Sequence, residues 1–403
     1  MRKYLLALLM LSLAGCGLTG EARSNRRRAQ RLAQSLLILD THIDTPFRLS
    51  RKEDDVTQRT SDGHFDLVRA RAGGLNAAFM SIYVSASYQE TGGAREQADQ
   101  LIDRVELMAR RAGAAARVAA SVSDVRENFA AGRLSLLLGM ENGAPLGNDV
   151  HLLQHFFDRG IRYITLTHSK DNQICDSSYD DKRTWQGLSP FGSVVVLEMN
   201  RLGIMIDVSH VSDDAFEQVL EISRAPVIAS HSSCRHFTPG WERNLSDDMI
   251  RRLADKNGVV QISFGAVFLR DEIRQRSRKN SDAVKEYAKA NGLVRDSEEY
   301  RDYKKTYFEQ HPIGEASVKD VADHIDHVVR LVGIDHVGFG SDFDGVDAVP
   351  EGLEDVSQFP LLIAELLERG YSAQELEKIA SGNLLRVLSK VEEAALRLQT
   401  VEP

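Results

Sequence analysis

The chain has 403 residues, of which 42% are hydrophobic and 27% are charged. These values are ordinary for a globular protein, and they exclude a disordered or a collagen-like chain. The formal net charge of −9 argues against nucleic-acid binding, for which a basic patch would be expected. The length fits two or three domains, or one (β/α) barrel with insertions.

The first residues have the pattern of an export signal. Two basic residues precede an apolar run over 4–13, which is too short to span a bilayer. The following Leu13-Ala14-Gly15-Cys16 resembles the lipobox at which bacterial lipoproteins are cleaved and acylated. We predict a lipoprotein signal peptide over 1–15, a lipidated Cys16 and a tether over 16–31. An ordinary secretory signal is the alternative.

The predicted lipid anchor sets the expected location. Several acyl chains on one cysteine form a stable membrane anchor. Gly17, rather than an aspartate, follows Cys16, and by analogy with bacterial lipoproteins this favours the outer membrane. We therefore expect the protein in the bacterial cell envelope, lipid-anchored and facing the periplasm. The Arg26-Arg27-Arg28 run is typical of a solvated tether, with contact to anionic lipid as the alternative.

Two further cysteines, Cys175 and Cys234, follow in the mature chain. Two cysteines are too few for a disulfide framework. An exported protein can still pair them, so a disulfide and two free thiols both stay open.

Eight short runs rich in aliphatic and β-branched residues predict eight strands. Near-continuous apolar runs are typical of parallel strands that are covered on both faces. The runs are 36–40, 75–83, 134–139, 161–166, 203–208, 226–230, 258–263 and 336–340.

The segments between these runs have the pattern of amphipathic helices, with Asn148, Ser212 and Ser246 as predicted N-caps. Strands that alternate with helices predict an α/β fold, a (β/α)8 TIM-like barrel, as a single catalytic domain over 32–403. The predicted helices are 94–118, 149–159, 192–201, 212–222, 246–256, 317–332 and 373–392.

A highly charged segment over 265–316 follows the seventh predicted strand. Its stretches DAVKEYAKA, 282–290, and SEEYRDYKKTYFEQ, 297–310, predict a helical insertion that covers the top of the barrel. A solvated surface and a lid over the site are both compatible with this charge.

Polar side chains follow most of the predicted strands. The chemistry of such a barrel takes place at the C-terminal ends of its strands. A single histidine there is usually a core residue, whereas six polar strand ends in register predict one polar mouth. These residues are His42 with Asp44, Glu141, His168, His210, His231, and Asp342 with Asp344, the last expected in a turn.

These residue types indicate a metal centre. Histidines and carboxylates without cysteine suit zinc at a catalytic site. His42 and Asp44 lie on one side of a strand, because residues i and i+2 share a face, and can bind one ion. His210 and His231 follow neighbouring strands and can bind a second ion. Glu141 lies between the two pairs in strand order, and its two oxygens can bridge ions about 3.5–4 Å apart.

Seven segments around these residues resemble the membrane dipeptidase (renal dipeptidase) family of binuclear zinc peptidases. The resemblance runs from about Leu36 to Val391. In chain order the segments are DTHIDTPFRL, LLLGMENG, ITLTHS, GIMIDVSH, PVIASHSSCRHF, ERNLSDDMI and HVGFGSDFDG.

The resemblance implies a barrel of the amidohydrolase, metal-dependent hydrolase type with two Zn²⁺ per chain. The implied reaction is the hydrolysis of dipeptides by a metal-bridging hydroxide. Dipeptides with a C-terminal D-residue and some β-lactams are further candidate substrates. Because family members are often dimers, a homodimer is a candidate assembly.

The resemblance also implies roles for individual residues. The five ligands of the two ions are those named above. His168 would contact the substrate carbonyl, Arg243 would hold the terminal carboxylate, and Asp342 would bind substrate and move protons. Glu141, His168 and Asp342 form the implied catalytic set. The mammalian enzymes carry tryptophan where this chain has Phe47, which affects the expected side-chain preference.

Two alternatives stay open. Another barrel amidohydrolase, such as a lactonase or a deacetylase, commonly bridges its metals with a carboxylated lysine. No lysine ends a predicted strand here, and Glu141 occupies the bridging place. A catalytically silent, peptide-binding lipoprotein predicts missing ligands, whereas all five metal positions are filled.

Overall fold

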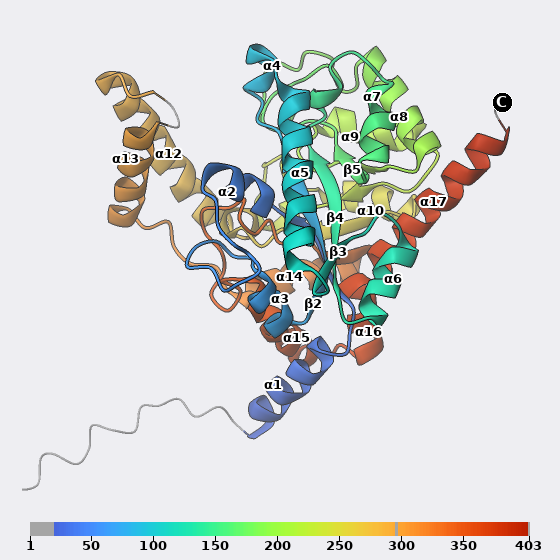
Figure 1. The fold of residues 1–403 in the computed structure, drawn as a ribbon. Coiled ribbons are helices and arrows are strands. Elements are labelled where there is room, and N and C mark those ends of the chain that lie inside the picture. The colour runs from blue at the N-terminus through green and yellow to red at the C-terminus, as the bar shows by residue number, and fades with distance from the viewer. Residues whose placement is uncertain (1–19, 295–296, 402–403) are drawn as a thin grey trace, which may run out of the picture.

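The protein is a parallel barrel surrounded by helices. The computed structural model describes residues 20–294 and 297–401. Within these residues one parallel sheet has nine strands, and eight of them close on themselves because β9 pairs with β1 and β2 with β4 (Figure 1). The predicted (β/α)8 barrel is confirmed. Its strands are β1 (Ile38–Ile43), β2 (Leu75–Tyr83), β4 (Leu134–Glu141), β5 (Ile161–Thr165), β6 (Met205–Asp207), β7 (Ile228–Ala229), β8 (Val259–Ile262) and β9 (Val337–Phe339).

The ninth strand, β3 (Ala116–Val118), lies outside the closed barrel. It pairs with the first residues of β4, and β5 pairs with the later residues of that strand. The predicted helix over 94–118 is therefore wrong at its end. The helix α5 (Ala94–Ala112) ends because Gly113 takes a positive φ of 59°, which few other residues tolerate.

The helices begin largely where the sequence predicts. The hydroxyls of Ser212 and Ser246 cap α9 and α10, as predicted, by accepting hydrogen bonds from the backbone three residues ahead. Asn148 is not a cap, because α7 begins later, after His151. The remaining helices are α1 (Gly20–Ala33), α2 (Thr45–Arg51), α3 (Leu67–Gly73), α4 (Tyr88–Thr91), α6 (Val122–Ala130), α7 (Leu152–Asp158), α8 (Pro190–Leu202), α9 (Asp213–Ile222), α10 (Asp247–Asp255), α11 (Ala266–Leu269), α12 (Asp271–Asn291), α13 (Glu298–Gln310), α14 (Val318–Val332), α15 (Phe359–Glu368), α16 (Ala373–Glu377) and α17 (Asn383–Val401).

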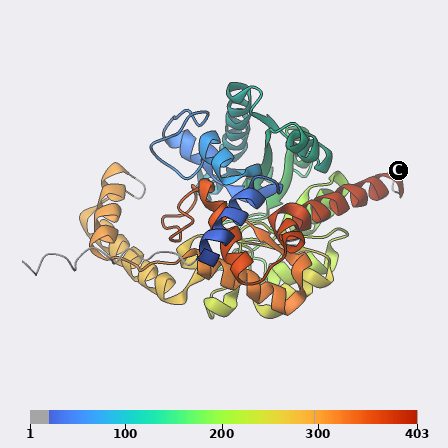
Figure 2. The ribbon, with the colours of Figure 1, turned by 90° about the horizontal axis from the view of Figure 1, so that it is seen from below.

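The charged insertion forms the predicted pair of helices, α12 and α13. Tyr287 of α12 stacks on Tyr303 of α13, with ring centroids 3.8 Å apart. The pair projects from the side of the barrel as an arm in Figures 1 and 2. The prediction that it covers the top of the barrel is therefore wrong. The helix α12 has a stripe of buried residues, whereas α13 has none. This agrees with the position of the arm, because a helix without a buried apolar face is not held against the barrel.

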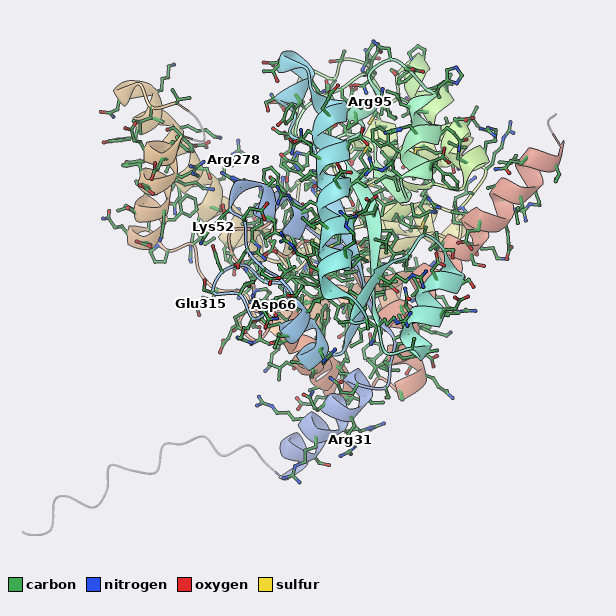
Figure 3. All side chains as sticks on the ribbon, viewed as in Figure 1. Arg31, Lys52, Asp66, Arg95, Arg278 and Glu315 are labelled. Carbon is green, nitrogen blue, oxygen red and sulfur yellow. The ribbon has the colours of Figure 1, made fainter. Side chains whose placement is uncertain are left out.

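The two ends of the barrel differ in what they carry. The helix α4 and the start of α5 follow the end of β2, so they mark the C-terminal ends of the strands. Figure 3 shows Arg95 of α5 at this end and Arg31 of α1 at the opposite end of the molecule. The mouth of the barrel therefore faces away from α1.

The interior of the barrel is packed with side chains rather than open. The ring of Tyr163 in β5 packs against that of Phe79 in β2, with centroids 5.0 Å apart and 41° between the ring planes. Gly139 of β4 makes this possible, because a Cβ at that position would lie 2.0 Å from the Tyr163 ring. The tyrosine hydroxyl is thereby carried up to the strand ends.

Several sequence features have a plain structural outcome. Cys175 and Cys234 are both free and buried, so they do not form a disulfide. The predicted signal peptide and Cys16 lie outside the described residues, as does the start of the predicted tether. In the part of the chain that the structure describes, no helix has both the length and the apolar character needed to cross a bilayer.

Candidate active site

The barrel brings the predicted polar residues to one place. Glu141 is the last residue of β4, and its side chain is buried at the centre of the mouth. Its Oε1 lies 3.1 Å from His210 Nε2, 3.3 Å from His231 Nε2 and 3.5 Å from His168 Nε2. Its Oε2 lies 3.4 Å from Nε2 of His42, at the end of β1. One carboxylate thus contacts histidines from four strand ends.

Charge around Glu141 keeps this carboxylate ionised. Burial alone would favour the neutral acid. The imidazoles around it, that of His42 first, outweigh burial and hold the pKa of Glu141 well below its usual value. The centre of the mouth therefore carries a fixed negative charge.

Two more carboxylates lie on the His42 side. Asp44 Oδ2 is 3.3 Å from His42 Nε2, and Asp342 belongs to the same group of potential ligands, whose atoms lie within 4.8 Å of one another. Gly345 leaves room for both, because a Cβ there would lie 2.3 Å from Asp44 Oδ2 and 2.4 Å from Asp342 Oδ1. Burial, together with the charges of Asp44 and Glu141, raises the pKa of Asp342 well above its usual range.

The backbone is strained at this mouth. His210, Asp342 and Asn142, the residue after Glu141, have φ values of 69°, 65° and 78°. Residues other than glycine rarely adopt such left-handed conformations, which cost about 1–3 kcal/mol each and are concentrated at functional sites. The left-handed conformation directs these side chains toward the centre of the mouth. An extended backbone would direct them away from it.

Tyr163 orients the imidazole of His42. The Tyr163 hydroxyl donates to the Thr41 carbonyl at 3.1 Å, so it accepts from His42 Nδ1 at 2.7 Å. Burial raises the pKa of Tyr163 far above its usual range, which keeps this hydroxyl protonated. With the proton on Nδ1, His42 presents the lone pair of Nε2 to the centre.

Asp207 and Ser230 orient His231 in the same way. Ser230 Oγ donates to Asp207 Oδ2 at 2.6 Å and lies 2.7 Å from His231 Nδ1, from which it accepts. The Asp207 side chain thus supports His231 through Ser230, while its Oδ1 accepts from the backbone of Ser209. Ser230 and Tyr163 escaped prediction, because a serine and a tyrosine within apolar strands have no chemical signature of their own.

The His42 side fits a cation. His42 Nε2 is buried without a hydrogen-bond partner among the described residues, and it faces oxygens of Asp44 and Glu141. A lone pair and two carboxylate oxygens repel one another unless a positive charge lies between them. Burial lowers the pKa of His42, but Tyr163 and the two carboxylates raise it well above its usual value. The pocket therefore attracts positive charge, which a divalent ion would supply.

The other side of Glu141 fits a second ligand group. His210 Nε2 and His231 Nε2 lie 2.8 Å apart and both face Glu141 Oε1. Burial lowers the pKa of both histidines well below the usual value, so both rings are neutral. Neutral imidazole is the form that binds zinc, at about 2.0–2.1 Å from nitrogen.

Arg243 lies buried beside this second group. Its Nη1 donates to Ser232 Oγ and its Nη2 to the His231 carbonyl, both at 2.7 Å. The guanidinium lies over the Phe268 ring, 5.0 Å from its centroid. Its Nε is buried with no partner in the described part of the chain. One N–H donor of the guanidinium is therefore free for a ligand. Only the family resemblance singled out this arginine, since it follows no strand.

Aromatic rings pack beside Arg243 and around the mouth. Trp241 stacks on Phe268 with centroids 5.3 Å apart, and Arg274 of α12 lies over Trp241 at 5.6 Å. This stack connects Arg243 to the base of the arm. On the opposite side, Tyr83 contacts both Phe47 and His168 edge-on, at 4.8 and 4.9 Å between centroids.

Asp344 has a structural role, as its turn-like context indicates. Its Oδ2 accepts from Thr45 Oγ1 at 2.6 Å and from Arg48 Nε at 3.0 Å, and its Oδ1 accepts from the backbone of His64. The carboxylate therefore ties α2 and the loop after it to the end of β9.

Comparison with known proteins decides the family. Residues 26–402 match the membrane dipeptidase family, peptidase family M19. The chain belongs to this family. The predicted family and the predicted class of enzyme, a dipeptidase-type hydrolase, are thereby confirmed.

Relatives of this dipeptidase are found among fungi and bacteria. Dipeptidase aclJ of Aspergillus oryzae is 37% identical over 348 residues, which cover 85% of this chain and 73% of that protein. The crystal structure of the probable dipeptidase PvdM from Pseudomonas aeruginosa has a TM-score of 0.81 at 30% identity, and the match covers 93% of this chain and 100% of that one. A metallo peptidase from Rhodobacter sphaeroides, solved with a phosphinate mimic of L-Ala-D-Ala, has a TM-score of 0.73 at 26% identity over 88% and 99% of the two chains.

The role of Tyr163 can be tested by removing one oxygen. In Tyr163→Phe the ring stays packed beside Gly139, but His42 Nδ1 loses its partner. We expect metal affinity to fall about 10–100-fold, as for other residues that orient a ligand. Competition with a chelator would measure this affinity. Tyr371→Phe is the matched control, because its hydroxyl donates to Asp326. Unchanged affinity in Tyr163→Phe would exclude the orienting role.

Proposed function

We propose that this chain is a zinc-dependent dipeptidase with two zinc ions, held by His42, Asp44, Glu141, His210 and His231. The position of Glu141 carries the proposal. Its Oε2 faces His42, and its Oε1 faces His210 and His231. One carboxylate thus presents an oxygen to each of two ligand groups, as a bridging ligand must.

The chain's own residues would complete the chemistry. Zinc held by these five residues would supply a water that is activated as a nucleophile near neutral pH. Asp342 lies beside Asp44, and we assign it the acceptance of a proton and its transfer to the leaving amine. His168 would donate a hydrogen bond to the carbonyl oxygen as it becomes negative. Losing one such donor typically costs about 10²–10³ in rate.

Arg243 accounts for a preference for dipeptides. Its guanidinium is held by Ser232 and by the His231 carbonyl and lies 3.1 Å from His210 Nε2, and its buried Nε has no partner among the described residues. A fixed guanidinium fork binds a carboxylate more strongly than a neutral group. A dipeptide presents its terminal carboxylate one residue after the scissile bond, where a longer peptide has an amide. The same centre would also open some β-lactams, whose strained amide presents an equivalent carbonyl.

A substrate panel tests the function. Zinc-loaded protein over residues 17–403 should hydrolyse L,L- or L,D-dipeptides and leave the matched tripeptides intact. The L-Ala-D-Ala mimic bound to the Rhodobacter sphaeroides relative makes L-Ala-D-Ala the first compound to assay. Glu141→Gln is the blank, because it removes the charge that joins the two ligand groups. If the zinc-loaded wild type hydrolysed none of the dipeptides, the proposal would be contradicted.

The clamp makes a separate prediction. Arg243→Lys keeps the charge but not the planar fork, so KM for dipeptides should rise about 10–100-fold while kcat changes little. Steady-state kinetics would measure both constants. Arg369→Lys is the matched control, because the Arg369 guanidinium binds the carboxylates of Asp326 in α14 and Glu365 in α15 and takes no part in the site. A wild-type KM in Arg243→Lys would remove this residue from the clamp.

We further propose that the protein is anchored in the outer membrane through acyl chains on Cys16, facing the periplasm. The position of α1, at the end of the barrel opposite the mouth, supports this arrangement, since an anchor before α1 would leave the mouth open to solutes. The homodimer implied by the resemblance stays a prediction.

Fractionation of cells that express the full chain tests the anchor. Cys16→Ser should move the protein from the membrane fraction to the soluble fraction or stop its maturation, since no thiol is left to acylate. Cys175→Ser, which replaces a buried free thiol, should stay with the membrane. Unchanged membrane association of mature Cys16→Ser would contradict lipidation at this residue.

A further inference from the structure

A second group of potential metal ligands lies outside the active site. It contains His236, Asp247 and His327, which come from three separate elements: the short 3-10 turn Arg235–Phe237, the start of α10, and α14. None of the three belongs to the predicted catalytic ligands. We call this group the loop cluster, and we propose that it binds one divalent transition-metal ion. Zinc is the ion with which we test this binding.

The geometry of the loop cluster favours a shared ion. His327 Nε2 lies 2.8 Å from Asp247 Oδ1. The His236 ring stacks on the His327 ring, with centroids 4.4 Å apart and 23° between planes. One ligand atom from each residue lies within 4.8 Å of the other two. Ligands of a tetrahedral zinc ion lie about 3.3–3.5 Å apart, so closure needs only a small movement of the exposed His236 ring.

The chemistry of the three side chains also fits a transition metal. Two imidazoles and one carboxylate are a ligand set that zinc binds in proteins, with the fourth position left to water. With neutral histidines the cluster carries one negative charge, which a divalent ion more than neutralises. The site is accessible, because His236 is exposed and Asp247 is half-buried.

Packing holds the buried part of the cluster in place. Phe237 contacts the rings of His324 and His327, with centroids 4.3 and 5.6 Å away. His324 is itself fixed, since its Nδ1 accepts from the backbone of Cys234 and its Nε2 donates to the Leu269 carbonyl. A site whose ligands are already oriented loses less entropy when an ion binds.

The ion would fasten the loop that serves the active site. His236 lies between His231, a catalytic ligand in our proposal, and Arg243, the proposed clamp. Arg235 also binds this loop internally, since its Nε donates to the Asn244 carbonyl at 2.7 Å. An ion on His236 would attach the loop to α10 and α14, which stabilises the folded state because only that state brings the ligands together.

Metal content tests the inference. Protein dialysed against buffered zinc should contain one ion more per chain than His236→Ala, as measured by elemental analysis. Asp247→Asn should also lose this ion, because it keeps an acceptor for His327 but removes the charge. Thermal melts during a zinc titration should show a second rise in Tm in the wild type that is absent from both variants.

Matched controls keep the test sharp. His151→Ala removes another exposed histidine, at the start of α7, and should retain the full zinc content. His236→Ala should hydrolyse dipeptides as the wild type does when zinc fills only the active site, which shows that the variant is folded. Equal zinc content in wild type, His236→Ala and Asp247→Asn would overturn the inference. Because metal content is read rather than turnover, this outcome is separate from failure of the proposed function.

Discussion

A single buried carboxylate, that of Glu141, determines how the mouth of this barrel is built. Burying a charge is unfavourable unless opposite charge or hydrogen-bond donors surround it. The closed barrel meets this condition, because parallel strands present their C-terminal ends at one place and deliver histidines from four of them. The two oxygens of Glu141 then divide those histidines into two groups, and this division supports the proposed two-metal centre.

The mouth is maintained at the expense of local stability. His210 and Asp342 adopt left-handed backbone conformations, and His42 Nε2 faces carboxylate oxygens. Such an arrangement persists only when the surrounding structure fixes it. Here the fixing groups lie one layer below the ligands. Tyr163 and Ser230 each accept a hydrogen bond from a histidine of the mouth, and Gly139 leaves the space that the tyrosine ring fills.

The segment between β7 and α10 joins the separate parts of the site. It begins with His231, carries the exposed His236 and ends near Arg243, whose guanidinium rests on Phe268. The stack of Phe268, Trp241 and Arg274 extends this connection to the base of the arm formed by α12 and α13. The position of Arg243, the proposed clamp, thus depends on packing between loops rather than on the barrel strands alone.

Alternating apolar runs and helical patterns were enough to predict the barrel from the sequence, because burial of parallel strands on both faces imposes that pattern. The polar residues at strand ends were equally visible, since His42, Glu141 and His231 follow apolar runs directly. Arg243 follows no strand, so it was identified only through the family resemblance. Two predictions about the fold were wrong. The predicted helix over 94–118 ends early because Gly113 has a positive φ, and the direction of the arm was missed because no local sequence pattern encodes it.

The sequence by itself therefore determined the fold class, the family and the residues that reach the mouth, because these follow from periodicity and from side-chain chemistry at strand ends. Only the tertiary structure decided which groups orient those residues. Tyr163 and Asp207 act through hydrogen bonds to side chains far away in the chain, and no sequence pattern records such partners. The loop cluster has the same origin, since His236, Asp247 and His327 become neighbours only when the barrel closes and its loops pack together.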